Sequence, residues 1–192
     1  MVLPIQQSAE RIIAAAAKSR RLIVSSPPGS GKSTKVPQLL LDRCGLKGRI
    51  AVLEPRRLAA RMLADRVAKE RGGAAGGEVG HRVRFDDRTG PKTRIVFETE
   101  GILLRELVSD PQLKKYSAII LDEFHERHIH GDITLAACLA LQRGQRPRRM
   151  AAFWGAQLRQ GGASSAHARW ARRLPRPLRE GLLPLAGEHP RL

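Results

Sequence analysis

Cysteine is scarce in this chain of 192 residues, which contains only Cys44 and Cys138. The two lie far apart and match no metal-ligand spacing, so the sequence argues against a disulfide scaffold and a cysteine zinc site. No stretch approaches the roughly 20 apolar residues that a membrane-spanning helix requires. Glu10 and Arg11 interrupt the N-terminal region, which has no apolar core of a signal peptide. We therefore expect a cytoplasmic protein without a membrane partner.

Aromatic residues are also few, at 4% of the chain, whereas the formal net charge is +17. The charge favours polyanionic partners such as nucleic acid. Because bases stack on aromatic side chains, their scarcity favours contacts with the nucleic-acid backbone over recognition of bases.

Short apolar runs alternate with segments of helical pattern. Strands are predicted at 21–26, 49–54, 93–99 and 116–123, with one more at the end of the glycine-rich segment GGAAGGEVGHRVRF, which starts at 72. Helices are predicted at 4–20, 35–45, 55–72, 100–110 and 131–143. This alternation predicts an α/β fold with a mostly parallel sheet flanked by helices.

A glycine-rich segment, VSSPPGSGKST, joins the first predicted strand to a helix. Gly29 and Gly31 allow backbone N–H groups to turn toward phosphate oxygens, and the helix N-terminus adds its dipole. In such a loop Lys32 reaches the β- and γ-phosphates and Ser33 ligates Mg²⁺. Ser26 stands where the usual motif begins with glycine, so the alternative of a turn that binds nothing stays open.

A second polar cluster, LDEFHERHIHGD, begins at the end of another apolar run. Asp122 and Glu123 would emerge beside the phosphate loop, where one carboxylate can hold Mg²⁺ and the other can orient the attacking water. His125, His128 and His130 offer an alternative metal cluster, but they lack the order and further ligands of zinc sites. For His128 and His130 a solvated loop position is favoured.

Several segments, in order along the chain, resemble motifs of the DEAH-box group of ATP-dependent helicases. They are EPRRLAAR (54–61), VGHRVRFDDRTGPKTRIVFETEG (79–101), TEGILLREL (99–107) and DEFHER (122–127), which follow the phosphate loop. Phe124 replaces the alanine usual in this group. The resemblance covers roughly residues 10–142 and points to the bacterial HrpB-type members.

The resemblance implies a RecA-like P-loop fold that binds ATP and Mg²⁺ and acts on single-stranded nucleic acid, with RNA the expected substrate. The phosphate contacts it implies are Gly29, Ser30, Gly31, Lys32, Ser33 and Thr34. It also implies that Asp122 holds Mg²⁺, that Glu123 orients water and that His125 couples nucleotide state to a later motif. Arg66 is a candidate for packing against the adenine. The implied nucleic-acid contacts are Pro55, Arg56, Arg57, Thr99, Glu100 and Gly101; a plain helix cap is the alternative for Thr99.

The composition changes near Gln142. Residues 143–192 contain eleven arginines, no lysine and only two acidic residues. We expect no strand in this Arg/Pro/Gly-rich tail and predict that it is disordered or comes from a shifted reading frame. The sequence contains no Ser-Ala-Thr motif of the helicase group, and we expect that the second RecA-like domain that would complete the ATP site is missing.

Two functions follow. The first is an ATP-dependent helicase whose ATP-binding domain spans residues 1–142, incomplete and impaired in unwinding. The second is a remnant that binds nucleotide and RNA without helicase activity. A P-loop kinase ranks far below both, because it leaves segments 54–61 and 99–107 unexplained.

Overall fold

The computed structural model describes residues 4–126, 128–143, 149–155 and 182–184. Its helices are α1 (Pro4–Gln7), α2 (Ala9–Lys18), α3 (Lys32–Arg43), α4 (Arg57–Glu70), α5 (Glu100–Ser109) and α6 (Ile129–Arg143), with a short 3₁₀ helix, η1 (Phe124–Glu126). Its strands are β1 (Arg21–Ser26), β2 (Arg49–Leu53), β3 (Val79–Val83), β4 (Asp86–Arg88), β5 (Ile95–Glu98), β6 (Tyr116–Leu121), β7 (Arg149–Gly155) and β8 (Leu182–Pro184).

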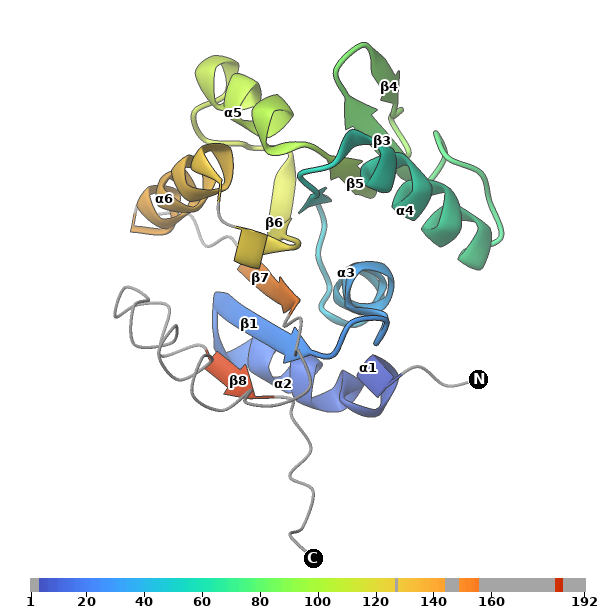
Figure 1. Ribbon diagram of the computed structural model, residues 1–192, viewed down its shortest axis with the longest axis vertical. Coiled ribbons are helices and arrows are strands. Elements are labelled where there is room, and N and C mark those ends of the chain that lie inside the picture. Colours follow the sequence, from blue (N-terminus) through green and yellow to red (C-terminus); the bar gives the residue numbers. More distant parts are fainter. Residues whose placement is uncertain (1–3, 127, 144–148, 156–181, 185–192) are drawn as a thin grey trace, which may run out of the picture.

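The strands form one sheet in the order β4-β3-β5-β2-β6-β7-β1-β8 (Figure 1). Every described pairing is parallel except that of β3 with β4. The carboxyl ends of β1, β2, β5 and β6 therefore meet at one edge of the sheet, where ligands bind in such folds.

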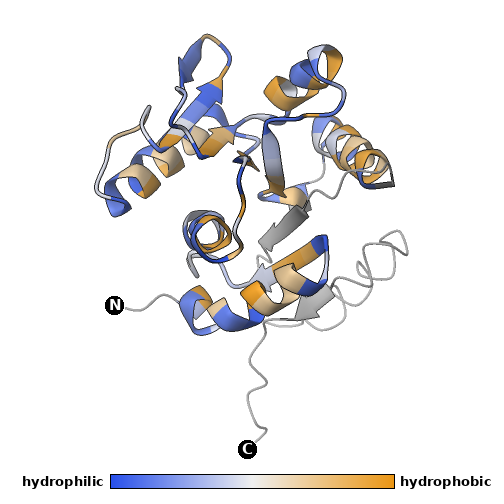
Figure 2. Ribbon diagram, turned by 180° about the vertical axis from the view of Figure 1, so that it is seen from behind, coloured by the Kyte–Doolittle hydropathy of each residue, from blue (hydrophilic) through white to orange (hydrophobic). Residues whose placement is uncertain are grey.

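Hydrophobic side chains cover both faces of the sheet. On one face, Val52 and Ile120 pack with residues of α2, α3 and α4, such as Val36. On the other, Leu53 and Leu121 pack with residues of α5 and α6. Figure 2 shows helices with hydrophobic residues along one side and hydrophilic residues along the other. Each fully buried Ile or Leu stabilises the fold by about 1.5–3 kcal/mol relative to an exposed one.

The predicted α/β class, with its mostly parallel sheet flanked by helices, is confirmed. The predicted helix at 4–20 is divided into α1 and α2, and the hairpin of β3 and β4 was not predicted. Within the described part of the chain, no helix is long and apolar enough to cross a membrane.

One expectation about residues 143–192 is wrong, because β7 and β8 are strands of the sheet. β7 pairs with both β1 and β6, whose facing edges both need a hydrogen-bonding partner. That long-range requirement, rather than the local sequence, makes residues 149–155 a strand. The rest of this segment lies outside the described residues, so its description as a poorly structured tail stays a prediction.

Candidate nucleotide-binding site

The phosphate loop connects β1 to α3 as the sequence predicts. Gly29 and Gly31 have φ values of 71° and 91°, in the left-handed region that glycine adopts without steric cost. Gly31 is the N-cap residue of α3, so the helix begins at Lys32. The Ser26 and Ser30 hydroxyls lie 2.6 Å apart, so Ser26 closes the loop from the position where the usual motif has glycine.

Lys32 points into the loop that precedes it. Its side chain is buried, and Nζ donates hydrogen bonds to the carbonyl oxygens of Ser26 (2.9 Å) and Pro27 (3.1 Å). Burial lowers the pKa of Lys32, while the carboxylates of Asp122 and Glu123 oppose that shift. The ammonium group is therefore held at the centre of the loop with two acidic groups near it.

Asp122 follows β6 directly and is 2% exposed. Burial raises its pKa to about 6, while the Ser33 hydroxyl lowers it. Oδ1 accepts a hydrogen bond from the Glu123 N–H (2.9 Å), and Oδ2 has no hydrogen-bond partner among the described residues. A buried carboxylate oxygen without a donor, beside a serine hydroxyl, fits a hard cation such as Mg²⁺. Ser33 and Asp122 are the residues that would hold it.

Glu123 has a φ of +46°, which is strained for a residue other than glycine and typical of functional sites. It lies in the wall of a cavity of about 600 Å³ that also contains the phosphate loop. The cavity is lined by Pro28, Gly29, Gly31, Lys32, Ser33, Thr34, Arg56, Leu63, Arg66, Glu123 and Glu126. The structure thus brings Glu123 and the predicted phosphate-binding residues other than Ser30 to one cavity, whereas Ser30 and Asp122 are buried and do not line it.

Two arginines of the cavity are paired with glutamates. Arg66 Nε lies 3.2 Å from Glu70 Oε1, and Glu70 also accepts a hydrogen bond from Lys35 Nζ (2.8 Å). Arg56 forms an ion pair with Glu126. Arg66 was predicted beside the nucleotide, whereas Arg56 was predicted on nucleic acid.

The other predicted nucleic-acid residues lie at the starts of α4 and α5. Arg57 donates a hydrogen bond to the Arg84 carbonyl oxygen (2.6 Å) in the turn between β3 and β4. Thr99 is the N-cap residue of α5 but makes no side-chain capping hydrogen bond. Glu100 is buried, and burial raises its pKa. Thr99 thus occupies the N-cap position, but it lacks the side-chain hydrogen bond by which a capping threonine stabilises a helix.

The histidines do not converge on one point in the described residues. His128 Nδ1 accepts a hydrogen bond from the Gly131 N–H (3.0 Å), and its Nε2 lies 3.4 Å from Glu100 Oε1. The His125 side chain lies outside the described residues, and His130 is exposed. Among the residues that the structure describes, no three His, Cys, Asp or Glu side chains form a group that could hold a metal ion.

Glu54 is a buried acid of the site that the sequence analysis did not single out. It follows β2 and is 4% exposed. Burial raises its pKa to about 7, and the neighbouring Asp122 carboxylate raises it further. Its Oε1 accepts a hydrogen bond from the Arg56 N–H (3.2 Å). The sequence signal was available, since Glu54 ends an apolar run in the same way as Asp122.

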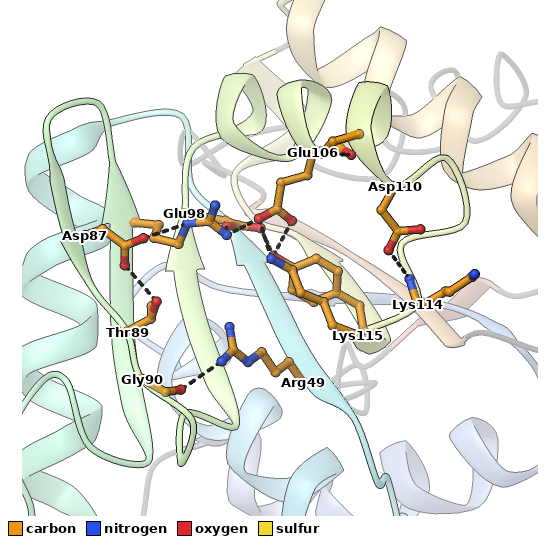
Figure 3. Close-up of polar contacts among 12 residues, drawn as sticks. Arg49, Asp87, Thr89, Gly90, Glu98, Glu106, Asp110, Lys114 and Lys115 are labelled. Carbon is orange, nitrogen blue, oxygen red and sulfur yellow. Dashed lines mark hydrogen bonds and ion pairs between the residues drawn. The ribbon is translucent and has the colours of Figure 1, made fainter.

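A second group of buried polar side chains lies between β5 and α5 (Figure 3). The Tyr116 hydroxyl lies 2.9 Å from Glu98 Oε1 and 2.8 Å from Glu106 Oε2. Arg82 and Lys115 form ion pairs with Glu106. Since Glu98 directly precedes Thr99, this group fixes the end of β5 from which the predicted nucleic-acid turn departs.

A parallel sheet with a phosphate loop after one strand and an acidic pair after another defines a P-loop nucleoside triphosphatase fold. A family model described as DEAD/DEAH box helicase matches residues 3–150, and the chain belongs to that family.

Similar proteins agree with this assignment. The chain is 42% identical over 144 residues to "ATP-dependent RNA helicase HrpB" of Escherichia coli, covering 75% of this chain and 18% of that protein. It is 45% identical over 142 residues to "ATP-dependent RNA helicase DHX33" of Homo sapiens, covering 73% of this chain and 20% of that protein. The crystal structure of the E. coli DExH-box NTPase HrpB superposes with a TM-score of 0.78 and 38% identity, over 81% of this chain and 19% of that one. The chain thus spans about a fifth of the length of these proteins.

Proposed function

We propose that this chain binds and hydrolyses ATP with Mg²⁺ as the first RecA-like domain of an ATP-dependent RNA helicase. The observation that carries the proposal is the convergence of Lys32, Asp122 and Glu123 from two separate segments. Lys32 and Glu123 line one cavity, and Asp122 lies next to Glu123 and near Lys32, at the edge of the sheet where both strands end.

The proposed roles follow from the geometry. The N–H groups of the loop and Lys32 would bind the phosphates, as the left-handed glycines and the position of Nζ support. Ser33 and Asp122 would hold Mg²⁺, which supplies charge neutralisation at phosphate oxygens when bound. Glu123, set by its strained backbone in the cavity wall, would accept a proton from the attacking water.

We propose that Pro55, Arg57 and the turn Thr99–Gly101 contact the backbone of single-stranded RNA. They follow β2 and β5 at the same edge of the sheet, and the net charge of +17 favours a polyanion. Relatives named RNA helicases support RNA as the substrate. Coupling through His125 and a cytoplasmic location are parts of the same proposal.

A second RecA-like domain would be needed to complete the ATP site and the nucleic-acid track. Because this chain spans about a fifth of the length of relatives named helicases, we retain as a second candidate a domain that binds nucleotide and RNA without unwinding. We also propose that the ATP-binding domain, expected from the sequence to end near residue 142, extends through β7, because β7 pairs with β1 and β6 and the family model reaches residue 150.

The test is ATP hydrolysis by the purified chain with and without single-stranded RNA, beside Glu123→Gln. Glu10→Gln is the matched control, because Glu10 is an exposed glutamate of α2, outside the cavity lining. We expect turnover that Glu123→Gln abolishes while ATP binding persists. Turnover that is equal in both variants would refute the role of Glu123. Binding without any turnover would favour the second candidate.

A further inference from the structure

Arg56 lies in the nucleotide cavity, although motif resemblance placed it on nucleic acid. Its backbone N–H is held by Glu54 Oε1 at 3.2 Å, and Glu54 is buried at the end of β2. Its guanidinium group forms an ion pair with Glu126, and both residues line the cavity that contains Lys32 and Glu123. Arg56 is thus held by two glutamates, by Glu54 at its backbone N–H and by Glu126 at its guanidinium group, while its side chain is 70% exposed.

The neighbouring arginine differs. Arg57 donates a hydrogen bond to the Arg84 carbonyl oxygen in the turn between β3 and β4 and does not line the cavity. Two adjacent arginines with the same local sequence signal therefore lie in different places.

The charged groups of the cavity indicate a role for Arg56 in binding nucleotide. Lys32 has its ammonium group hydrogen-bonded to two carbonyl oxygens of the loop, and Arg66 is paired with Glu70. Arg56 lines the same cavity as Glu123, the group proposed to orient water for attack on a terminal phosphate. A guanidinium carries five N–H donors in a planar fork, so its ion pair with one carboxylate leaves donors for a phosphate.

We infer that Arg56 is a nucleotide-binding residue that favours a triphosphate over a diphosphate, and that Glu126 positions its guanidinium group. The inference rests on the proposed function, because it takes the cavity to be the ATP site. The inference adds to that function a residue that binds the terminal phosphate.

The experiment measures binding of a non-hydrolysable ATP analogue and of ADP, each with Mg²⁺, to the full chain. A charge-assisted hydrogen bond to phosphate predicts a roughly tenfold weaker affinity of Arg56→Gln for the analogue, and a less than twofold change for ADP. Arg56→Lys should recover part of the loss. Arg61→Gln is the matched control, since Arg61 is an arginine of α4, the helix that Arg56 precedes, and pairs with Asp86 (2.8 Å) outside the cavity lining.

Glu126 is tested by a double-mutant cycle. If it positions Arg56, the effect of Arg56→Gln on analogue binding should nearly vanish in the Glu126→Ala background. An undiminished effect there would overturn the positioning role.

Three outcomes would overturn the role of Arg56. In the first, Arg56→Gln binds nucleotide with unchanged affinity but binds single-stranded RNA more weakly, as Arg57→Gln does. That result would show that Arg56 contacts nucleic acid and not the nucleotide. Another is equal weakening of the analogue and ADP. The third is unchanged nucleotide affinity in Lys32→Ala, which would remove the proposed function and this inference with it. If Lys32→Ala loses binding while Arg56→Gln does not, only the inference fails.

Discussion

Glu98 gives a stability prediction that is independent of any ligand. Its side chain is 0% exposed at the end of β5, and burial raises its pKa to about 8, with the Glu106 carboxylate adding to the shift. Arg82 lies 3.7 Å away and opposes the shift, as does the Tyr116 hydroxyl. The folded protein therefore holds Glu98 in its neutral form at neutral pH, and Glu98→Gln should imitate that form.

The sign of the pH dependence follows from the proton balance. An unfolded glutamate ionises near pH 4.5, whereas folded Glu98 keeps its proton up to about pH 8. Between these values the unfolded chain binds fewer protons than the folded one, so the free energy of unfolding falls as pH rises, by about 1.4 kcal/mol per pH unit. The total loss from this one group is on the order of 5 kcal/mol. Above about pH 8 it no longer grows.

The assay is urea unfolding of the unsubstituted chain and of Glu98→Gln at several pH values between 5 and 9. Titrating groups that do not interact with Glu98 contribute equally to both proteins, so the difference in unfolding free energy reports Glu98 together with the Glu106 carboxylate that is coupled to it. We expect this difference to move in favour of Glu98→Gln from pH 5 to pH 8 and then to level off. A difference that is the same at pH 5 and pH 8 would show that Glu98 is ionised in the fold and would refute the reasoning.

Four further predictions follow from the structure. Lys32→Ala should abolish ATP binding in calorimetry; unchanged affinity would contradict the loop assignment. Asp122→Asn should raise the Mg²⁺ concentration needed to bind ATP analogue, and a Mg²⁺ titration identical to that of the unsubstituted chain would count against Asp122 as a ligand. Gly80→Ala should cost about 1–3 kcal/mol in urea unfolding, because its Cβ would lie 2.2 Å from the Arg88 carbonyl oxygen. Gly101→Ala is the control for that substitution, with nothing within 4 Å of the added carbon. Deleting residues 149–192 should lower the thermal midpoint strongly, since β7 pairs with strands on both sides; an unchanged midpoint would show that this segment adds no stability.

The sequence predicted the parts of the site whose signals are local. The phosphate loop needs left-handed glycines before a helix, and that requirement is visible in a few adjacent letters. Asp122 and Glu123 end an apolar run, and the rule that parallel strands end at one edge brings them to the loop. The position of Arg56 could not be predicted from local sequence in this way. Its sequence signal equals that of Arg57, and only the position of Glu126, 70 residues further along the chain, separates the two.

β7 shows the same limit at the level of the fold. Residues 149–155 lie in an arginine-rich segment with no strand pattern around them, and the pairing is decided by β1 and β6, which are distant in sequence. The pairing of β7 also affects the geometry of the nucleotide site. β1 leads into the phosphate loop and β6 leads into Asp122, and β7 is the one strand between them in the sheet order. Because neighbouring strands are about 4.8 Å apart, β7 sets a separation of about 10 Å between β1 and β6. The segment that resembles the family least thus fixes the lateral distance between the two motifs that resemble it most.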